Sequence, residues 1–140
     1  MTSLPEAEAA LALGEVAAAA DALVASFAAH DRAAYFASFT PEATFVFHTS
    51  TQRLASRADY EREWASWEAD GFHVDACESI DRRIDLITLE VAVMTHRVRT
   101  RIAGVEETQH ERETIVFRRT PEGRWVAVHE HLSPDPERDR

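Results

Sequence analysis

The sequence predicts an α+β domain in which three N-terminal helices pack against one curved antiparallel sheet. Alanine-rich and aromatic stretches with helical spacing fill the first half of the chain. The second half alternates apolar and polar residues over long runs that are separated by turn signals. With 140 residues, 45% of them hydrophobic, the chain is long enough to form one domain with a substantial core.

The expected helices cover residues 6–30, 32–39 and 57–70. Gly14 weakens the first of them and is expected to break off a short initial piece. Asp31 and Ser56 suit the N-cap positions of the second and third helices, because their side-chain oxygens can accept backbone N–H groups. Gly71 suits the position after the third helix, where a left-handed residue ends the last turn.

The expected strands cover residues 43–49, 72–81, 84–102, 106–119 and 125–132. Ala103-Gly104 and the stretch Thr120 to Gly123 are turn signals between the last three strands. Residues 1–133 are therefore expected to form a single domain. The charged, proline-bearing residues 134–140 are expected to be a disordered tail.

The turn at Ala103-Gly104 also predicts a register for the hairpin around it. It would place Thr95 beside Glu113 and His96 beside Arg112, on opposite faces of the sheet. On the last strand, period 2 puts Trp125, Ala127, His129 and His131 on one face and Val128, Glu130 and Leu132 on the other. A β-bulge in the hairpin would reverse this assignment locally.

Charge and composition exclude several classes of partner. The formal net charge of −10 and the pI of about 5.1 disfavour nucleic acid or an anionic membrane as a partner. The single cysteine, Cys77, is expected to be a small buried residue. The N-terminus has no basic region before an apolar run, and no uninterrupted apolar stretch reaches about 18 residues. A cytoplasmic protein without a membrane span is the expectation.

The C-terminal sequence resembles a known superfamily. The pattern E-T-x-V-F-x-R, a turn, G-R-W and V-H-x-H-x-S-P spans Glu113 to Pro134. It is similar to the end of the SnoaL-like and ketosteroid-isomerase-like proteins of the nuclear-transport-factor-2 (NTF2) superfamily, and to the association domain of calcium/calmodulin-dependent protein kinase. The order of elements over residues 6–133 agrees with that fold, a cone of bent sheet closed by helices. The resemblance implies a pocket inside the cone and a homodimer through the outer sheet face.

On an ungapped match, the kinase domain has pocket arginines where this chain has Thr95, Ile115 and Leu132. The same anionic ligand is therefore not expected. The match instead implies a mostly apolar wall with two carboxylates, Glu113 and Glu130. The residues expected to line this pocket are Phe39, Phe47, Trp64, Thr95, Ile115, Phe117, Val128 and Leu132.

Three residues are candidates for catalysis. Glu113 and Glu130 would act as general bases with raised pKa in an apolar cavity, and Tyr35 would donate a hydrogen bond. The structural alternative is that the two carboxylates pair with Arg112, Arg97 or a backbone group at the sheet edge.

The histidines have two possible roles. His129 and His131, with His96 and Arg112, either pack at a subunit interface or take part in acid/base chemistry. No metal site is expected, because a third ligand cannot be located.

Two functions of different classes fit these residues. The first is a cofactor-independent enzyme that moves a proton next to a carbonyl in a small apolar or polycyclic molecule, as in isomerisation, cyclisation or dehydration. The second is a non-catalytic domain of the same fold that binds a ligand or assembles as a dimer. The fold alone does not choose between them, because it hosts several functions.

Overall fold

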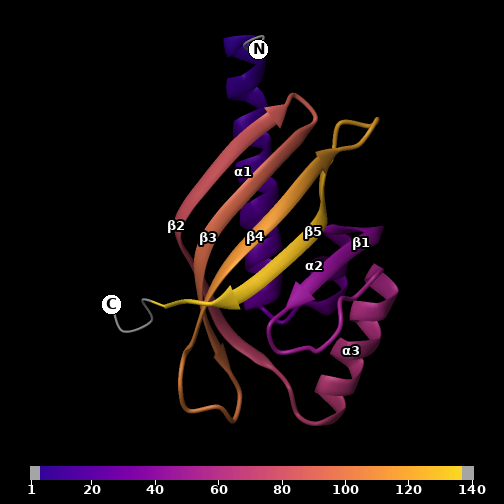
Figure 1. Cartoon of the computed structure of the whole chain (residues 1–140), viewed down its shortest axis with the longest axis vertical. Coiled ribbons are helices and arrows are strands. Elements are labelled where there is room, and N and C mark those ends of the chain that lie inside the picture. The colour runs from indigo at the N-terminus through magenta and orange to yellow at the C-terminus, as the bar shows by residue number, and fades with distance from the viewer. Residues whose placement is uncertain (1–3, 137–140) are drawn as a thin grey trace.

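The computed structural model describes residues 4–136 and has three helices and five strands (Figure 1). The helices are α1 (Glu6–Ala28), α2 (Arg32–Ala37) and α3 (Arg57–Ala69). The strands are β1 (Phe39–Phe47), β2 (Val74–Thr88), β3 (Val91–Ile102), β4 (Gln109–Arg119) and β5 (Trp125–Pro134). The predicted α+β cone is confirmed.

The five strands form one sheet in the order β1-β5-β4-β3-β2. The pairs from β5 to β2 are antiparallel, whereas β1 lies parallel to β5 at the edge, so the sheet is mixed rather than wholly antiparallel. Helix α1 runs behind the sheet along its concave face, and α2 and α3 lie beside β1 at one end (Figure 1). The sheet thus has an inner face toward α1 and an open outer face.

Local sequence signals explain the helix ends. The Asp31 side chain accepts the N–H of Ala34 at 3.2 Å, and Ser56 Oγ accepts the N–H of Asp59 at 3.1 Å, so both predicted N-caps are present. Gly71 follows α3 with a φ of 96°, in the left-handed region that favours glycine. Gly14 does not break the first helix, because α1 continues through it on an exposed surface.

Several strand boundaries differ from the expectation. The expected strands 72–81 and 84–102 are divided differently, since β2 runs without a break to Thr88 and a turn at Leu89 and Glu90 joins it to β3. The Thr88 hydroxyl accepts the N–H of Glu90 at 3.0 Å, so the turn forms without glycine or proline. The first strand begins at Phe39 instead of 43, and Pro41 is accommodated because β1 is an edge strand.

The C-terminal end is more ordered than expected. Pro134 belongs to β5, and the N–H of Asp135 donates to the carbonyl of His110 at 3.1 Å. The rest of the predicted tail, residues 137–140, lies outside the described residues.

The predicted β3–β4 register is wrong by one residue. His96 pairs with Glu113 and Thr95 pairs with Thr114, because the loop between the strands covers residues 103–108 and does not turn tightly at Gly104. A one-residue slip moves every side chain of a strand to the other face. His96 therefore lies on the inner face and Thr95 on the outer face.

A β-bulge in β5 changes the faces of that strand as well. Phe117 pairs with Ala127 and the adjacent Val116 pairs with His129, which leaves Val128 without a partner across the ladder. Trp125 and Ala127 are consequently buried on the same inner side as Glu130, whereas the sequence pattern had put them opposite.

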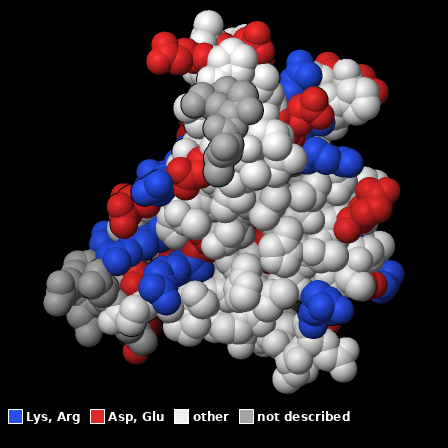
Figure 2. Space-filling model, turned by 45° about the horizontal axis from the view of Figure 1, so that its top comes forward, with Lys and Arg blue, Asp and Glu red and all other residues white. Residues whose placement is uncertain are grey.

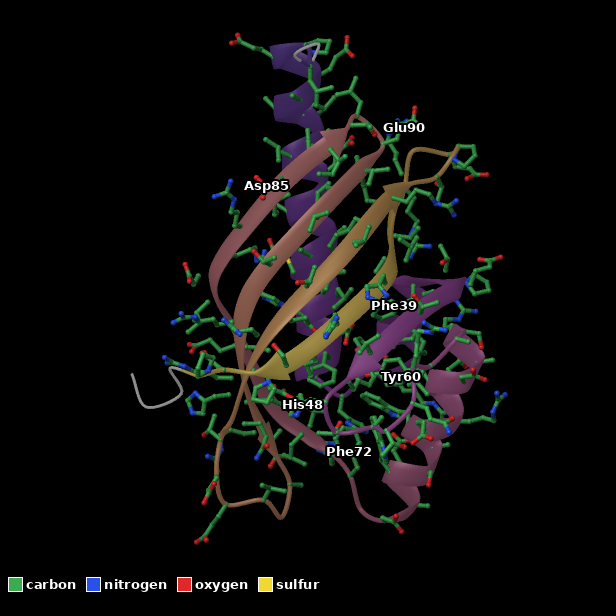
Figure 3. All side chains as sticks on the ribbon, in the orientation of Figure 1. Phe39, His48, Tyr60, Phe72, Asp85 and Glu90 are labelled. Carbon is green, nitrogen blue, oxygen red and sulfur yellow. The ribbon has the colours of Figure 1, made fainter. Side chains whose placement is uncertain are left out.

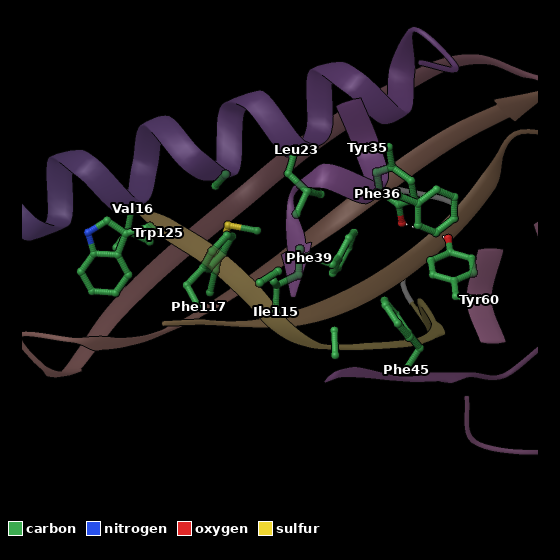
Figure 4. Packing of buried hydrophobic residues seen from close by; sticks show 14 of the residues in the cluster. Val16, Leu23, Tyr35, Phe36, Phe39, Phe45, Tyr60, Ile115, Phe117 and Trp125 are labelled. Atoms are coloured by element: carbon green, nitrogen blue, oxygen red, sulfur yellow. Dashed lines mark hydrogen bonds between the residues drawn. The ribbon is translucent and has the colours of Figure 1, made fainter. Parts of the chain in front are cut away.

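The narrow end of the cone holds a closely packed core (Figure 4). Ala12, Val16 and Ala20 of α1 are small, so the helix approaches the sheet closely there. Buried partners from three strands fill the space beneath them: Ala92, Met94, Ile115, Phe117, Trp125 and Ala127. Trp125 Nε1 donates to Glu15 of α1 at 3.1 Å and satisfies the indole.

By length and composition, α1 is apolar enough to cross a membrane, because an 18-residue stretch of it has a mean hydropathy of 1.6. The face that it packs on the sheet gives the same apolar composition an ordinary use in the core.

Candidate active site

The wide end of the cone contains a cavity of about 350 Å³ between the sheet and the ends of the helices. His48, Tyr60 and Phe72 come together at this end, far from Glu90 at the β2–β3 turn (Figure 3). Apolar side chains make most of the wall: Leu23, Val24, Phe27, Phe47, Trp67, Phe72, Val98, Ile102, Val105 and Leu132. The size and lining are typical of a small-molecule site.

Two carboxyl groups enter this apolar cavity from the inner face of the sheet, Glu113 from β4 and Glu130 from β5. They form a side-chain hydrogen bond with each other. The pKa of Glu113 is raised from 4.5 to about 8, chiefly by burial; the hydrogen bond with Glu130 lowers it, and the charge of the nearby Glu111 raises it. Burial, followed by the charge of Glu113, raises the pKa of Glu130 well above its usual range. Two acids that share a dry site cannot both ionise easily, so the pair holds at least one proton near neutral pH.

A chain of tyrosines leads to Glu130. The hydroxyls of Tyr35 and Tyr60 lie 2.9 Å apart (Figure 4), and the Tyr35 hydroxyl lies 3.4 Å from both oxygens of Glu130. Burial, together with the charge of Glu130, raises the pKa of each tyrosine, so both remain protonated. Tyr60 can therefore donate to Tyr35, which in turn donates to Glu130.

Glu113 has a second partner on β3. Its Oε1 lies 2.6 Å from His96 Nε2, and His96 Nδ1 lies 2.6 Å from the Ser79 hydroxyl on β2. Burial lowers the pKa of His96 to about 4, and the positive charge of Arg82 acts in the same direction. His96 is therefore neutral at neutral pH, and its contact with Glu113 is a hydrogen bond rather than an ion pair.

A third carboxylate lies where the cavity approaches solvent. Glu111 lines the cavity, and its Oε2 lies 2.6 Å from Nε2 of His48, whose side chain is 32% exposed. This pair is wetter than the Glu113–Glu130 pair, so the dry end of the cavity is the better place for proton transfer.

The structure brings five of the sequence-predicted residues together around the cavity: Tyr35, Phe47, Glu113, Glu130 and Leu132. All three candidate catalytic residues are in this group. Neither carboxyl of the pair is bridged to an arginine by an ion pair among residues 4–136, so the structural alternative of arginine pairing does not describe them.

Six predicted lining residues lie elsewhere. Phe39, Trp64, Ile115 and Phe117 are fully buried in the packed core next to the cavity, because aromatic and aliphatic neighbours surround them on every side. Thr95 is exposed on the outer face because of the register slip, and Val128 sits at the bulge of β5. Their predicted place in the pocket is wrong.

The predicted interface residues divide between the two faces. His129, His131 and Arg112 lie on the outer face, where Thr44 Oγ1 is 2.8 Å from His129 Nδ1. Burial and the neighbouring His131 lower the pKa of His129. His96 is 3% exposed and belongs to the inner network, so an interface role for it is wrong, whereas the acid/base alternative is open.

Sequence reasoning missed Tyr60 and put His96 on the wrong face of the sheet. The sequence marks Tyr60 only as an aromatic residue of the expected helix 57–70, and nothing in it indicates the contact with Tyr35. The signal for His96 was available: Arg97, Arg99 and Arg101 share the parity of Thr95, which marks that face as solvent-exposed and leaves His96 on the other. Among residues 4–136, no group of three or more His, Cys, Asp or Glu side chains is arranged to hold a metal ion.

Comparison with known proteins places this architecture in a family. The model of the SnoaL-like domain matches residues 16–136. The chain belongs to the SnoaL-like family. No curated protein matches this SnoaL-like chain in sequence.

Solved structures share its fold at low sequence identity. An NTF2-like protein from Pseudomonas putida KT2440 superposes with a TM-score of 0.76 at 17% identity, covering 99% of this chain and 95% of that one. A ketosteroid isomerase-like protein from Erwinia carotovora atroseptica gives 0.74 at 18%, covering 87% and 95%. ActVI-ORFA from Streptomyces coelicolor gives 0.69 at 18%, covering 88% and 96%.

Proposed function

We propose that this SnoaL-like protein is a cofactor-independent enzyme that transfers a proton next to a carbonyl group of a small apolar or polycyclic compound. The observation that supports this most directly is the pair of hydrogen-bonded carboxyl groups, Glu113 and Glu130, in an apolar cavity. Isomerisation, cyclisation and dehydration all need such a step. The likeness to a ketosteroid isomerase-like structure is consistent with this class of reaction.

In the proposed reaction, one carboxyl of the pair is ionised and the other is protonated. The ionised carboxylate removes a proton from the carbon next to the carbonyl, so a C–H bond breaks, an O–H bond forms and an enolate develops. The protonated carboxyl or the Tyr35 hydroxyl donates a hydrogen bond to the developing oxyanion. Return of the proton to another carbon completes an isomerisation, and loss of a β-hydroxyl as water completes a dehydration.

The cavity favours a neutral, apolar substrate. Its wall is largely aliphatic and aromatic, and no lysine or arginine side chain lines it. A carboxylate or phosphate substrate would have to be buried beside two acidic groups without a cation, which is strongly unfavourable. A ring system with one carbonyl at its inner end would place that oxygen near Tyr35 and the carboxyl pair.

Deuterium exchange tests the proposal without knowledge of the natural substrate. A panel of cyclic ketones and enones is incubated with the protein in D₂O, and loss of the proton next to the carbonyl is followed by ¹H NMR. We expect at least one compound to exchange with the wild type about 100-fold faster than with the double variant Glu113→Gln/Glu130→Gln, which removes the base whichever carboxyl supplies it. Glu122→Gln is the matched control, because Glu122 is exposed in the β4–β5 turn.

Equal exchange rates for the wild type and the double variant would contradict the enzymatic proposal. A compound that binds in the cavity but never exchanges would favour the alternative, a ligand-binding domain of the same fold.

We also propose that a second copy of this chain binds the outer sheet face. Partly exposed valines lie on this face: Val93 and Val116 pair across β3 and β4, and Val46 lies on the edge strand β1. Much of the surface at the centre of the view in Figure 2 carries no charged side chain. An apolar patch on a sheet whose other face is covered suits a two-fold interface.

Sedimentation equilibrium tests the dimer. We expect a dimer for the wild type and a monomer for Val116→Arg, because the substitution puts a charge into the contact. Leu11→Arg is the control, since Leu11 is 66% exposed on α1, away from this face. A monomeric wild type would contradict the proposal.

A further inference from the structure

The hydrogen bonds of Ser79 determine which nitrogen of His96 carries the proton. Arg82 points two donors at the Ser79 hydroxyl oxygen, with Nε at 3.3 Å and Nη2 at 3.2 Å. A hydroxyl oxygen has two lone pairs and one proton. Arg82 has only donors, so the Ser79 oxygen accepts from it, and the hydroxyl proton is what Ser79 offers to its third partner, His96 Nδ1, at 2.6 Å.

This assignment fixes the imidazole. Nδ1 accepts from Ser79, and a neutral ring must then carry its proton on Nε2. The opposite tautomer would aim a third N–H at the Ser79 oxygen and leave the hydroxyl proton without a partner. With Nε2–H in place, His96 donates to Glu113 Oε1 across their 2.6 Å contact.

We propose that Arg82, Ser79 and His96 are positioning residues that lock the Nε2–H tautomer of His96, and thereby make Glu113 the member of the carboxyl pair that ionises and accepts the substrate proton. A donor aimed at Glu113 stabilises its carboxylate. Glu130 receives its nearest protein donor, Tyr35, at the longer distance of 3.4 Å. Glu130 is therefore the member that keeps the proton.

The backbone of β2 is shaped for this contact. The β2–β3 ladder shifts between Ile80 and Arg83, so Asp81 and Arg82 form a bulge opposite His96. Asp81 has a φ of 53°, a left-handed conformation that is uncommon for any residue except glycine. Asp21 of α1 also holds Arg82, with Arg82 Nη1 donating to its Oδ1 at 2.6 Å. Without the bulge, regular alternation would give Arg82 a different position along the strand.

The charged groups around Glu113 favour the same division of roles. Glu111 on the same strand opposes its ionisation, while His96 on β3 is neutral. The hydroxyls of Tyr35 on α2 and Tyr60 on α3 are uncharged at neutral pH. The bond between the two carboxyls lowers the pKa of Glu113 and raises that of Glu130.

The catalytic meaning of this inference rests on the proposed function, but the tautomer and the order of ionisation are measurable in the resting protein. If no ketone exchanged in the assay, the proposed function would fail, but the inferred tautomer and order of ionisation could still be correct. A wrong tautomer would overturn the inference even if exchange is fast.

Long-range ¹H–¹⁵N NMR correlation of the imidazole gives the tautomer directly. In the wild type between pH 6 and 8, we expect His96 Nε2 to show the shift of a protonated nitrogen and Nδ1 that of an unprotonated one. A protonated Nδ1, or an imidazolium over this range, would overturn the proposal.

Arg82→Met tests the source of the lock, because the Ser79 oxygen then regains two free lone pairs. We expect a mixture of the two His96 tautomers and a pKa of Glu113, followed by ¹³C NMR of its carboxyl, about one pH unit above the wild-type value. Arg83→Met is the matched control. Arg83 is the next residue of β2 and also pairs with an aspartate, Asp85, but its side chain is 76% exposed. The same change in both variants would reduce the effect to lost charge and overturn the inference.

A second pair of variants stands if Arg82→Met does not fold. Gln replaces His96 with a side chain that can donate to Glu113 and accept from Ser79, whereas Leu does neither. We expect His96→Gln to leave the pKa of Glu113 within about half a pH unit of the wild type and His96→Leu to raise it by about one unit or more. Equal pKa values in the two variants would overturn the role of His96.

Discussion

The two ends of the cone use the same sheet face for opposite purposes. At the narrow end, α1 contributes small residues such as Val16 and Ala20, and Met94 and Phe117 fill the space beneath them. At the wide end, α1 contributes Leu23 and Phe27, and a cavity remains between them and the sheet. One strand takes part in both: β4 carries Ile115 and Phe117 at the packed end and Glu113 and Glu111 at the hollow end.

The difference shows how packing prepares a site for acid/base chemistry. The packed end has native density and tolerates no polar group without a partner. The hollow end is equally dry around the carboxyl pair but leaves room for a ligand, so burial raises the pKa of Glu113 to about 8 without closing the site. The packed end holds the strands in place, and this fixes the positions of the carboxyl groups at the hollow end.

A carboxyl group placed at the packed end should give the largest effect. Met94 is fully buried among apolar side chains, so Met94→Glu would bury an acid without the hydrogen-bond partners that Glu113 has. We expect a loss of about 4 kcal/mol or more in the free energy of unfolding, measured by urea denaturation.

Thr95→Glu is the control for this substitution. Thr95 is adjacent in sequence but exposed on the outer face, so we expect a change within about 0.5 kcal/mol. Similar losses in both variants would mean that the two faces of β3 are assigned incorrectly.

Truncation of aliphatic side chains compares the two ends with a smaller loss of stability. Ile115 lies in the packed end at 0% exposure, and Leu132 lines the cavity. We expect Ile115→Ala to cost about 3 kcal/mol and Leu132→Ala about 1 kcal/mol, because the wall of an existing cavity loses fewer contacts. Thermal or urea unfolding measures both, and a larger cost for Leu132→Ala would argue that the wide end is closed and packed in solution.

The fold was predictable because its signals are local and repeated. Helical aromatic spacing, the caps at Asp31 and Ser56 and the long alternating runs gave the order of elements, and the C-terminal motif gave the family. The β2–β3 turn was not predictable from the same rules, since Leu89 and Glu90 are not turn-forming residue types. Its cause is the Thr88 hydroxyl, which only the folded geometry reveals.

The site was predictable in part, and the errors about which face of the sheet a side chain occupies have one origin. The identities of Glu113, Glu130 and Tyr35 followed from chemistry, but side-chain direction in a strand depends on register, and a single residue reverses it. The slip between β3 and β4 exchanged Thr95 for His96. The bulges at Val128 and at Asp81–Arg82 are set by long-range packing, so no local pattern marks them.

The pH dependence of stability should report the carboxyl pair. The native pKa of Glu113 is raised to about 8, whereas the unfolded chain titrates near 4.5, so between these values the native state binds more protons. The unfolding free energy contributed by the pair is therefore fully present below pH 4.5 and is lost as the pH rises toward 8. Relative to the double variant Glu113→Gln/Glu130→Gln, the wild type should lose about 1.4 kcal/mol per pH unit between pH 5 and 8 for each carboxyl that stays protonated in the native state, and so up to about 2.7 kcal/mol per unit for the pair. Parallel stability curves for the two proteins would show that the carboxyls ionise normally in the native state.

The smallest effect concerns Cys77, which lines the cavity and gives it a chemical probe. Burial raises the pKa of this thiol to about 11, although the Thr100 hydroxyl, 3.7 Å from its sulfur, acts in the opposite direction. The thiolate is the reactive form, so alkylation by iodoacetamide at pH 8 should be at least about tenfold slower than for a cysteine peptide. A ketone that fills the cavity should slow it further, as followed by intact-protein mass spectrometry, whereas one that binds the outer face should not. If Cys77 reacts at the peptide rate, the wide end is open to solvent, and the dry environment that raises the pKa of Glu113 is absent.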